Sequence, residues 1–140
     1  MRCAMTMPPC AIQPHDHNES LIEISNEHVH LVALLEALDY CFNEPVDDDA
    51  VGVVLDELLE ETRAHFMHEE DLMYETGYLK YLEHQADHRH ILGLIEDLIA
   101  QHRAHTVDMK KEARWLIEKW MADHFEKFDR DLIVTISEKF

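Results

Sequence analysis

The sequence predicts an all-α fold, namely an up-down-up-down antiparallel four-helix bundle with an extended N-terminal arm. Apolar residues recur in steps of three and four along four long stretches, which is the pattern of amphipathic helices. Only three glycines and four prolines occur in 140 residues, too few turn formers for an all-β fold. This length suits one domain with a single core. We therefore divide the chain into an N-terminal arm over residues 1–18 and a four-helix bundle domain over residues 19–140.

A change in composition separates the arm from the first helix. Residues 1–18 contain three of the four prolines and the polar run His15-Asp16-His17-Asn18, which favours an extended conformation. The first helix is expected over about residues 20–42, where His28 falls in phase with apolar positions such as Leu31. His28 thus occupies a core position of the predicted bundle.

The second helix is expected over about residues 48–75, and its apolar stripe includes two polar side chains, His65 and Glu69. An unpaired glutamate in that stripe would cost on the order of several kcal/mol of desolvation. Glu69 therefore requires a nearby cation. The neighbouring His68 and Glu70 fall outside the stripe and are predicted to lie on a solvated face.

After a turn at a glycine, the third helix is expected over about residues 79–104. His84 and His88 lie in phase with its apolar residues, and their spacing of four places both on one face of the helix. Such a pair can hold one metal ion between its two side chains. His65 and Glu69, also four residues apart, form a similar pair on the preceding helix.

The fourth helix is expected over about residues 108–138, with Trp120 and His124 on its inner side. Asp129 follows His124 by five residues, so in an α-helix the two side chains would flank the inner face instead of stacking. This spacing suits a carboxylate that reaches sideways to bridge two ions.

Seven polar side chains are predicted to meet at one level of the bundle. Glu69 and His84 are equidistant from the turn near Gly77, and the other breaks in the chain produce similar symmetry. Bundle cores build two-metal sites from side chains on facing helices. The candidate metal ligands are five imidazoles and two carboxylates: His28, His65, Glu69, His84, His88, His124 and Asp129.

Imidazole and carboxylate ligands without a thiolate suit iron, with manganese and zinc as rivals. Two six-coordinate ions offer about twelve positions. The histidines, two bridging carboxylates (Glu69 and Asp129) and a bridging oxide or hydroxide would fill all but one. The remaining position suits a small, weakly polar ligand such as dioxygen, in a pocket lined by Trp120, Met121, Phe125 and Phe128.

The composition excludes several classes of partner. A formal net charge of −18 argues against nucleic acid and against anionic membrane surfaces. No apolar run approaches the length of a membrane span, and the first ten residues lack the apolar region of a secretory signal. The three cysteines, Cys3, Cys10 and Cys41, are an odd number without metal-ligand spacing, which favours a reducing compartment. We expect a cytoplasmic protein.

These residues resemble the hemerythrin family, in particular the single-domain bacterial hemerythrins, over about residues 20–135. The matching runs are Ile24-x-x-x-His28, His65-Phe66-x-x-Glu69-Glu70-x-x-Met73, His84-x-x-x-His88 and Trp120-x-x-x-His124-Phe125-x-x-x-Asp129. The chain differs from the usual pattern in having Ser25, Met121 and Phe125 where aspartate, leucine and isoleucine are common. The resemblance implies a hemerythrin-like four-helix bundle over residues 19–140.

The resemblance also assigns the ligands. It implies that His84, His88 and His124 hold one iron, that His28 and His65 hold the other, and that Glu69 and Asp129 bridge the two. Dioxygen would bind at the two-histidine iron. The leading hypothesis is therefore reversible dioxygen binding for storage, delivery or scavenging, without enzymatic turnover, because the inner residues include no evident substrate anchor or free general base. The alternatives are a di-iron oxidoreductase acting on peroxide or nitric oxide, and an oxygen or redox sensor.

Overall fold

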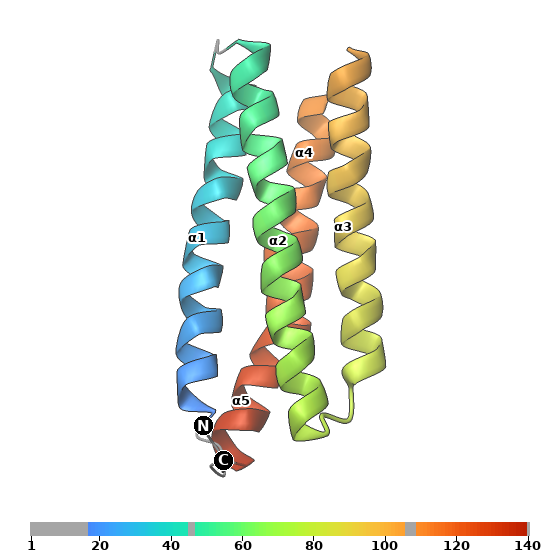
Figure 1. Ribbon diagram of the computed structural model, residues 1–140. Coiled ribbons are helices and arrows are strands. Elements are labelled where there is room, and N and C mark those ends of the chain that lie inside the picture. Colours follow the sequence, from blue (N-terminus) through green and yellow to red (C-terminus); the bar gives the residue numbers. More distant parts are fainter. Residues whose placement is uncertain (1–16, 45–46, 106–108, 140) are drawn as a thin grey trace, which may run out of the picture.

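The structure, a computed structural model, describes residues 17–44, 47–105 and 109–139. These residues form four antiparallel rods, and the described part of the chain contains no strand (Figure 1). The helices are α1 (Asn18–Asn43), α2 (Asp48–Thr76), α3 (Tyr81–Ala104), α4 (Met109–Glu118), η1 (Lys119–Asp129) and α5 (Arg130–Lys139). The last three segments make up the fourth rod. The predicted four-helix bundle is confirmed, whereas the predicted arm lies outside the described residues up to position 16.

The turn between α2 and α3 explains why these helices lie side by side. Gly77 ends α2 with a φ of 64°, a left-handed conformation that glycine adopts without the steric penalty of a Cβ atom. Its backbone N–H donates to the carbonyls of Met73 and Tyr74, in the last turn of α2, where carbonyls lack partners further along the helix. The chain reverses within a few residues, and Tyr81 begins α3.

The fourth rod is not the continuous α-helix that the sequence predicts, because its middle segment η1 is a π-helix. The backbone N–H of Arg130 donates to the carbonyl of Phe125, five residues earlier. Hydrogen bonds that close over five residues widen the helical turn, so residues five apart return to the same face. His124 and Asp129 have this spacing, and both are completely buried. The expectation that these two side chains flank the inner face is therefore wrong.

The core consists of two apolar clusters with a layer of polar side chains between them. The larger cluster contains Leu35, Leu58, Phe66 and Trp120, and the smaller contains residues such as Leu132. Each side chain of this kind contributes roughly 1.5–3 kcal/mol when it is fully buried. The apolar residues on both sides therefore fix the height at which the polar layer lies.

Not every apolar side chain of the helices faces inward. Leu82, near the start of α3, is 75% exposed. Leu116 is completely buried in the larger cluster, and its neighbour Ile117 is only partly buried against it. Among the described residues, no helix has the length and apolar character needed to cross a membrane.

Candidate metal centre

The structure brings all seven predicted ligands into the polar layer, and all seven are buried: His28, His65, Glu69, His84, His88, His124 and Asp129. Their donor atoms form two groups that share Glu69 and Asp129. One group adds three histidines and the other adds two, and within each group the donor atoms lie within 4.8 Å of one another. Each group is therefore small enough to surround one cation.

Asp129 lies among three of the imidazole rings. Its Oδ2 is 2.6 Å from Nε2 of His28. Its Oδ1 is 2.8 Å from Nε2 of His84 and 2.9 Å from Nε2 of His124. Because His28 belongs to the two-histidine group and the other rings belong to the three-histidine group, the carboxylate of Asp129 spans both.

Glu69 also spans both groups. Its Oε1 lies 2.9 Å from Nε2 of His88, in the three-histidine group. Its Oε2 lies 3.3 Å from Nε2 of His65, in the two-histidine group. The two carboxylates can therefore each contribute one oxygen to each of two neighbouring ions.

Several of these inward-facing atoms lack a hydrogen bond of acceptable geometry. They are Nε2 of His65, Nε2 of His124 and Oε2 of Glu69, all of them buried. Buried polar atoms without partners are costly, and one cation in each of the two groups would satisfy all of them. The donor set consists of imidazole nitrogens and carboxylate oxygens without a thiolate, which suits iron. The residues present therefore fit a metal centre of the predicted kind.

Three further carboxylates hold the outer nitrogens of three rings. The Nδ1 atoms of His65, His88 and His124 lie 2.9, 2.8 and 2.6 Å from oxygens of Glu27, Glu70 and Asp87, respectively. We call these three acidic residues the supporting carboxylates. Each supporting carboxylate comes from the helix that precedes its histidine in the chain. A carboxylate of α1 contacts a histidine of α2, one of α2 contacts a histidine of α3, and one of α3 contacts a histidine of η1. A carboxylate on Nδ1 fixes the tautomer and turns Nε2 toward the metal.

The supporting carboxylates are not among the residues predicted from the sequence. Glu70 is only partly exposed and contacts His88, so the prediction that it lies on a solvated face is wrong. Their positions in the sequence could have identified them, because each supporting carboxylate is adjacent to a candidate metal ligand: Glu27 to His28, Glu70 to Glu69, and Asp87 to His88. A residue beside an inward-facing ligand points toward a neighbouring helix.

The buried carboxylates control the protonation of the rings. Burial lowers the pKa of His65, but Glu69 and Glu27 outweigh this effect and raise that pKa to about 10. Burial likewise lowers the pKa of His124, while Asp129 and Asp87 raise it to about 9. Without a cation, protons on these rings balance the carboxylates. A metal ion would take the place of those protons.

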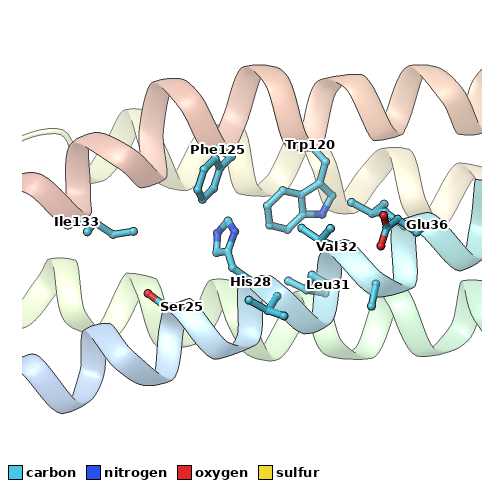
Figure 2. Close-up of a pocket in the computed structure, with 11 residues that line it drawn as sticks. Ser25, His28, Leu31, Val32, Glu36, Trp120, Phe125 and Ile133 are labelled. Atoms are coloured by element: carbon cyan, nitrogen blue, oxygen red, sulfur yellow. The ribbon is translucent and has the colours of Figure 1, made fainter.

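The residues predicted to line an oxygen pocket do not all lie around one space. Trp120 and Phe125 line a cavity of about 460 Å³ together with His28, and Figure 2 shows His28 reaching toward these two rings from α1. We call this space, which lies between α1 and the η1 and α5 segments, the His28 cavity. Phe128 instead packs near His84 and His124, at ring-centroid distances of 5.3 and 5.4 Å. The side chain of Met121 lies outside the described side chains.

Comparison of the sequence with known protein families shows what kind of site this polar layer is. A sequence model of the hemerythrin HHE cation-binding domain matches residues 21–135, which include all seven candidate ligands. The chain belongs to the hemerythrin family. The buried layer is therefore the cation-binding site of a hemerythrin domain, and the family implies iron as the cation.

Several bacterial proteins named bacteriohemerythrin are similar to this hemerythrin domain. The relative from Campylobacter jejuni is 27% identical over 129 residues, covering 89% of this chain and 97% of the relative. The relative from Stenotrophomonas maltophilia is 27% identical over 115 residues, which cover 82% of this chain and 74% of the relative. The match to the Methylococcus capsulatus protein is 28% identical over 80 residues, 57% of this chain, and spans only 61% of that relative. No solved structure matches the chain.

Proposed function

We propose that the site holds two iron ions and binds dioxygen reversibly, for storage, delivery or scavenging. One ion would lie among His84, His88 and His124, the other would lie between His28 and His65, and Glu69 and Asp129 would bridge them. The observation that carries this proposal is the unequal division of five histidines about two shared carboxylates. It leaves the two-histidine ion with fewer protein ligands. Iron would supply the electrons for dioxygen binding, which these side chains cannot supply.

The surrounding residues suit this role. The supporting carboxylates orient three of the rings, and the apolar clusters on both sides limit the entry of water to the layer. Trp120 and Phe125 give the His28 side an aromatic wall, which favours an uncharged gas over an ion. In this proposal the chain is a carrier and not an enzyme. The proposed compartment is the cytoplasm, supported by the odd number of cysteines and by the free thiol of Cys41.

Anaerobic reconstitution with ferrous iron tests the proposal. We expect two irons per chain by metal analysis, and a visible absorption band that appears when air is admitted and fades on deoxygenation. A Glu69→Gln variant should lose the band, whereas Glu75→Gln, on an exposed part of α2, should keep it. If the unchanged protein binds two irons but shows no reversible band, dioxygen carriage is excluded.

The second candidate function is a di-iron oxidoreductase acting on peroxide or nitric oxide. The unequal division of the histidines also favours it, because an ion with two histidine ligands would leave room for peroxide or nitric oxide as well as for dioxygen. Multiple turnovers of peroxide or nitric oxide with an added electron donor would support this function. Stoichiometric and reversible gas uptake without product would exclude it.

A further inference from the structure

A second group of metal-binding side chains lies at the surface between α1 and α2, which pack against each other (Figure 1). Glu23 and Glu27 come from α1, and His68 comes from α2. One donor atom of each residue lies within 4.8 Å of the other two. We call these three residues the outer cluster. Unlike the buried layer, the outer cluster is open to solvent, because the side chains of Glu23 and His68 are 65% and 42% exposed.

The distances within the outer cluster suit one small cation. Nδ1 of His68 lies 2.5 Å from Oε2 of Glu27 and 3.8 Å from Oε1 of Glu23. Nitrogen and oxygen ligands that lie about 2.0–2.2 Å from a zinc ion are separated from one another by about 3 Å or slightly more. The two observed distances lie on either side of that value. Small movements of the side chains would therefore place an ion between the three donors.

Glu27 is already held in place by the buried layer. Its Oε1 lies 2.9 Å from Nδ1 of His65, a candidate iron ligand, whereas its Oε2 faces His68. The two oxygens of one carboxylate thus contact the layer and the outer cluster. A ligand that is held by another contact loses less conformational freedom when it binds an ion. A cation in the outer cluster would therefore share Glu27 with His65.

The charge around the outer cluster favours a cation. Asp71 of α2 lines the same hollow, of about 160 Å³, as Glu23 and His68. In the described part of the chain, no lysine or arginine forms an ion pair with Glu23, Glu27 or Asp71. The net charge of −18 adds to the negative potential there. The imidazole of His68 distinguishes the outer cluster from a purely acidic surface and favours a transition metal ion over Mg²⁺ or Ca²⁺, which prefer oxygen ligands.

A similar group on the same two helices provides a comparison. His30 of α1 and two glutamates of α2, Glu57 and Glu61, also bring donor atoms within 4.8 Å of one another. Nε2 of His30 lies 3.7 Å from Oε1 of Glu61, and these side chains are 51% and 43% exposed. Arg63 lines the hollow beside Glu57, and its positive charge opposes the binding of a cation there. We call these three residues the comparison group and expect it to bind a cation more weakly than the outer cluster.

We propose that Glu23, Glu27 and His68 form a third cation site, which binds one divalent first-row transition metal ion at the surface of the bundle. His68 would supply a nitrogen donor, and the two glutamates would supply oxygen donors. Water would fill the remaining positions on the ion, because the outer cluster is open to solvent. The ion would lie beside the buried layer and be joined to it through the carboxylate of Glu27. Cation binding here does not depend on whether the layer carries dioxygen.

Titration with Mn²⁺ of full-length protein that holds two equivalents of Zn²⁺ tests this site. Zinc fills the buried layer without redox chemistry, and Mn²⁺ does not displace it, because manganese binds such ligands more weakly than zinc does. Electron paramagnetic resonance measures the free Mn²⁺, and we expect one ion to bind per chain in a saturable way. In nuclear magnetic resonance spectra, substoichiometric Mn²⁺ should broaden the backbone signals of the outer cluster before those of Glu57 and Glu61.

Two substitutions each remove a single donor. Glu23→Gln and His68→Gln should each weaken Mn²⁺ binding roughly tenfold or more, since losing even an outer partner of a metal ligand costs roughly 10- to 100-fold. Both variants should keep two zinc ions per chain by metal analysis. In the described structure neither side chain forms a hydrogen bond or ion pair with any of the seven candidate ligands. His30→Gln and Glu57→Gln, in the comparison group, should leave the Mn²⁺ affinity unchanged.

Three outcomes would overturn the proposal. The first is Mn²⁺ binding that His68→Gln leaves unchanged, because the imidazole would then not be a ligand. The second is displacement of bound Mn²⁺ by an equal concentration of Mg²⁺, which would indicate a general attraction of cations to acidic side chains. The third is equal broadening of the outer cluster and the comparison group at every Mn²⁺ concentration, which would show that no specific site exists. All three are measured on the zinc form, so none depends on whether the iron form carries dioxygen.

Discussion

Nδ1 of His124 on η1 lies 2.6 Å from Oδ2 of Asp87 on α3. Nζ of Lys119 lies 3.1 Å from the other oxygen of the same carboxylate. Burial raises the pKa of Asp87, but hydrogen bonds with His124 and Lys119 lower it to about 2. Asp87 is therefore ionised at neutral pH and holds the ring proton of His124 on Nδ1, which leaves Nε2 available for a metal ion.

Removing this carboxylate should weaken metal binding. Asp87→Ala is expected to lower iron affinity roughly 10- to 100-fold, the usual effect of losing such a partner. Asp87→Asn should lose less, because the amide oxygen can still accept from Nδ1. Competition with a chelator measures both, and Asp97→Asn, on an exposed part of α3, serves as the control. Unchanged affinity in Asp87→Ala would show that His124 is oriented by other contacts.

Glu69 should be required for the second metal ion. Its oxygens face both histidine groups, so Glu69→Gln replaces a bridging anion with a neutral amide. We expect fewer than two irons per chain to remain after desalting, as measured by metal analysis. Glu75→Gln, which changes an exposed glutamate of the same helix, should retain the full count. Two tightly held irons in Glu69→Gln would refute a bridging role.

In the metal-free protein, His65 and His124 should link stability to pH. The carboxylates around them outweigh burial and raise their pKa values from 6.5 to about 10 and about 9. A pKa raised on folding adds stability that is complete below the unfolded value and disappears as pH rises through the folded value. The free energy of unfolding should therefore fall between about pH 7 and pH 10. Metal affinity should rise over the same range, because fewer protons compete.

Urea denaturation of the metal-free protein across this pH range measures the effect. His65→Gln should flatten the dependence, because it removes the ring with the larger shift. His30→Gln, on an exposed part of α1, should leave the dependence unchanged. A free energy of unfolding that rises from neutral to alkaline pH in the unchanged protein would contradict the assignment.

The sequence could predict the five histidines and Glu69 from their position because each of them lies in phase with an apolar stripe. His28 and His84 are buried for the same reason as their leucine and isoleucine neighbours, since the helical period carries all of them inward. The π-helix could not be predicted in this way. Its wider turn is stabilised when it brings His124 and Asp129 onto the same face, and this depends on partners from α1 and α3 that local periodicity does not include.

Contacts between rods escaped prediction for a similar reason. Glu70 lies outside the apolar stripe of α2 by period, yet it contacts His88 on α3. Helical phase describes one helix at a time and does not show which neighbour covers its flank. The His28 cavity depends on the distance between α1 and the η1 and α5 segments, which no pattern within a single helix specifies.

The glycines provide a test of the turn that positions the two halves of the site. Gly77→Ala should destabilise the protein by about 1–2 kcal/mol, because the residue has a φ of 64° and an added Cβ atom is strained there. Gly93→Ala is the matched control within α3, where an added Cβ meets nothing within 4 Å. It should stabilise the protein by about 0.5–1 kcal/mol through better helix propensity. Urea denaturation of both metal-free variants measures these opposite signs, and equal effects would contradict the role of Gly77 as the left-handed end of α2.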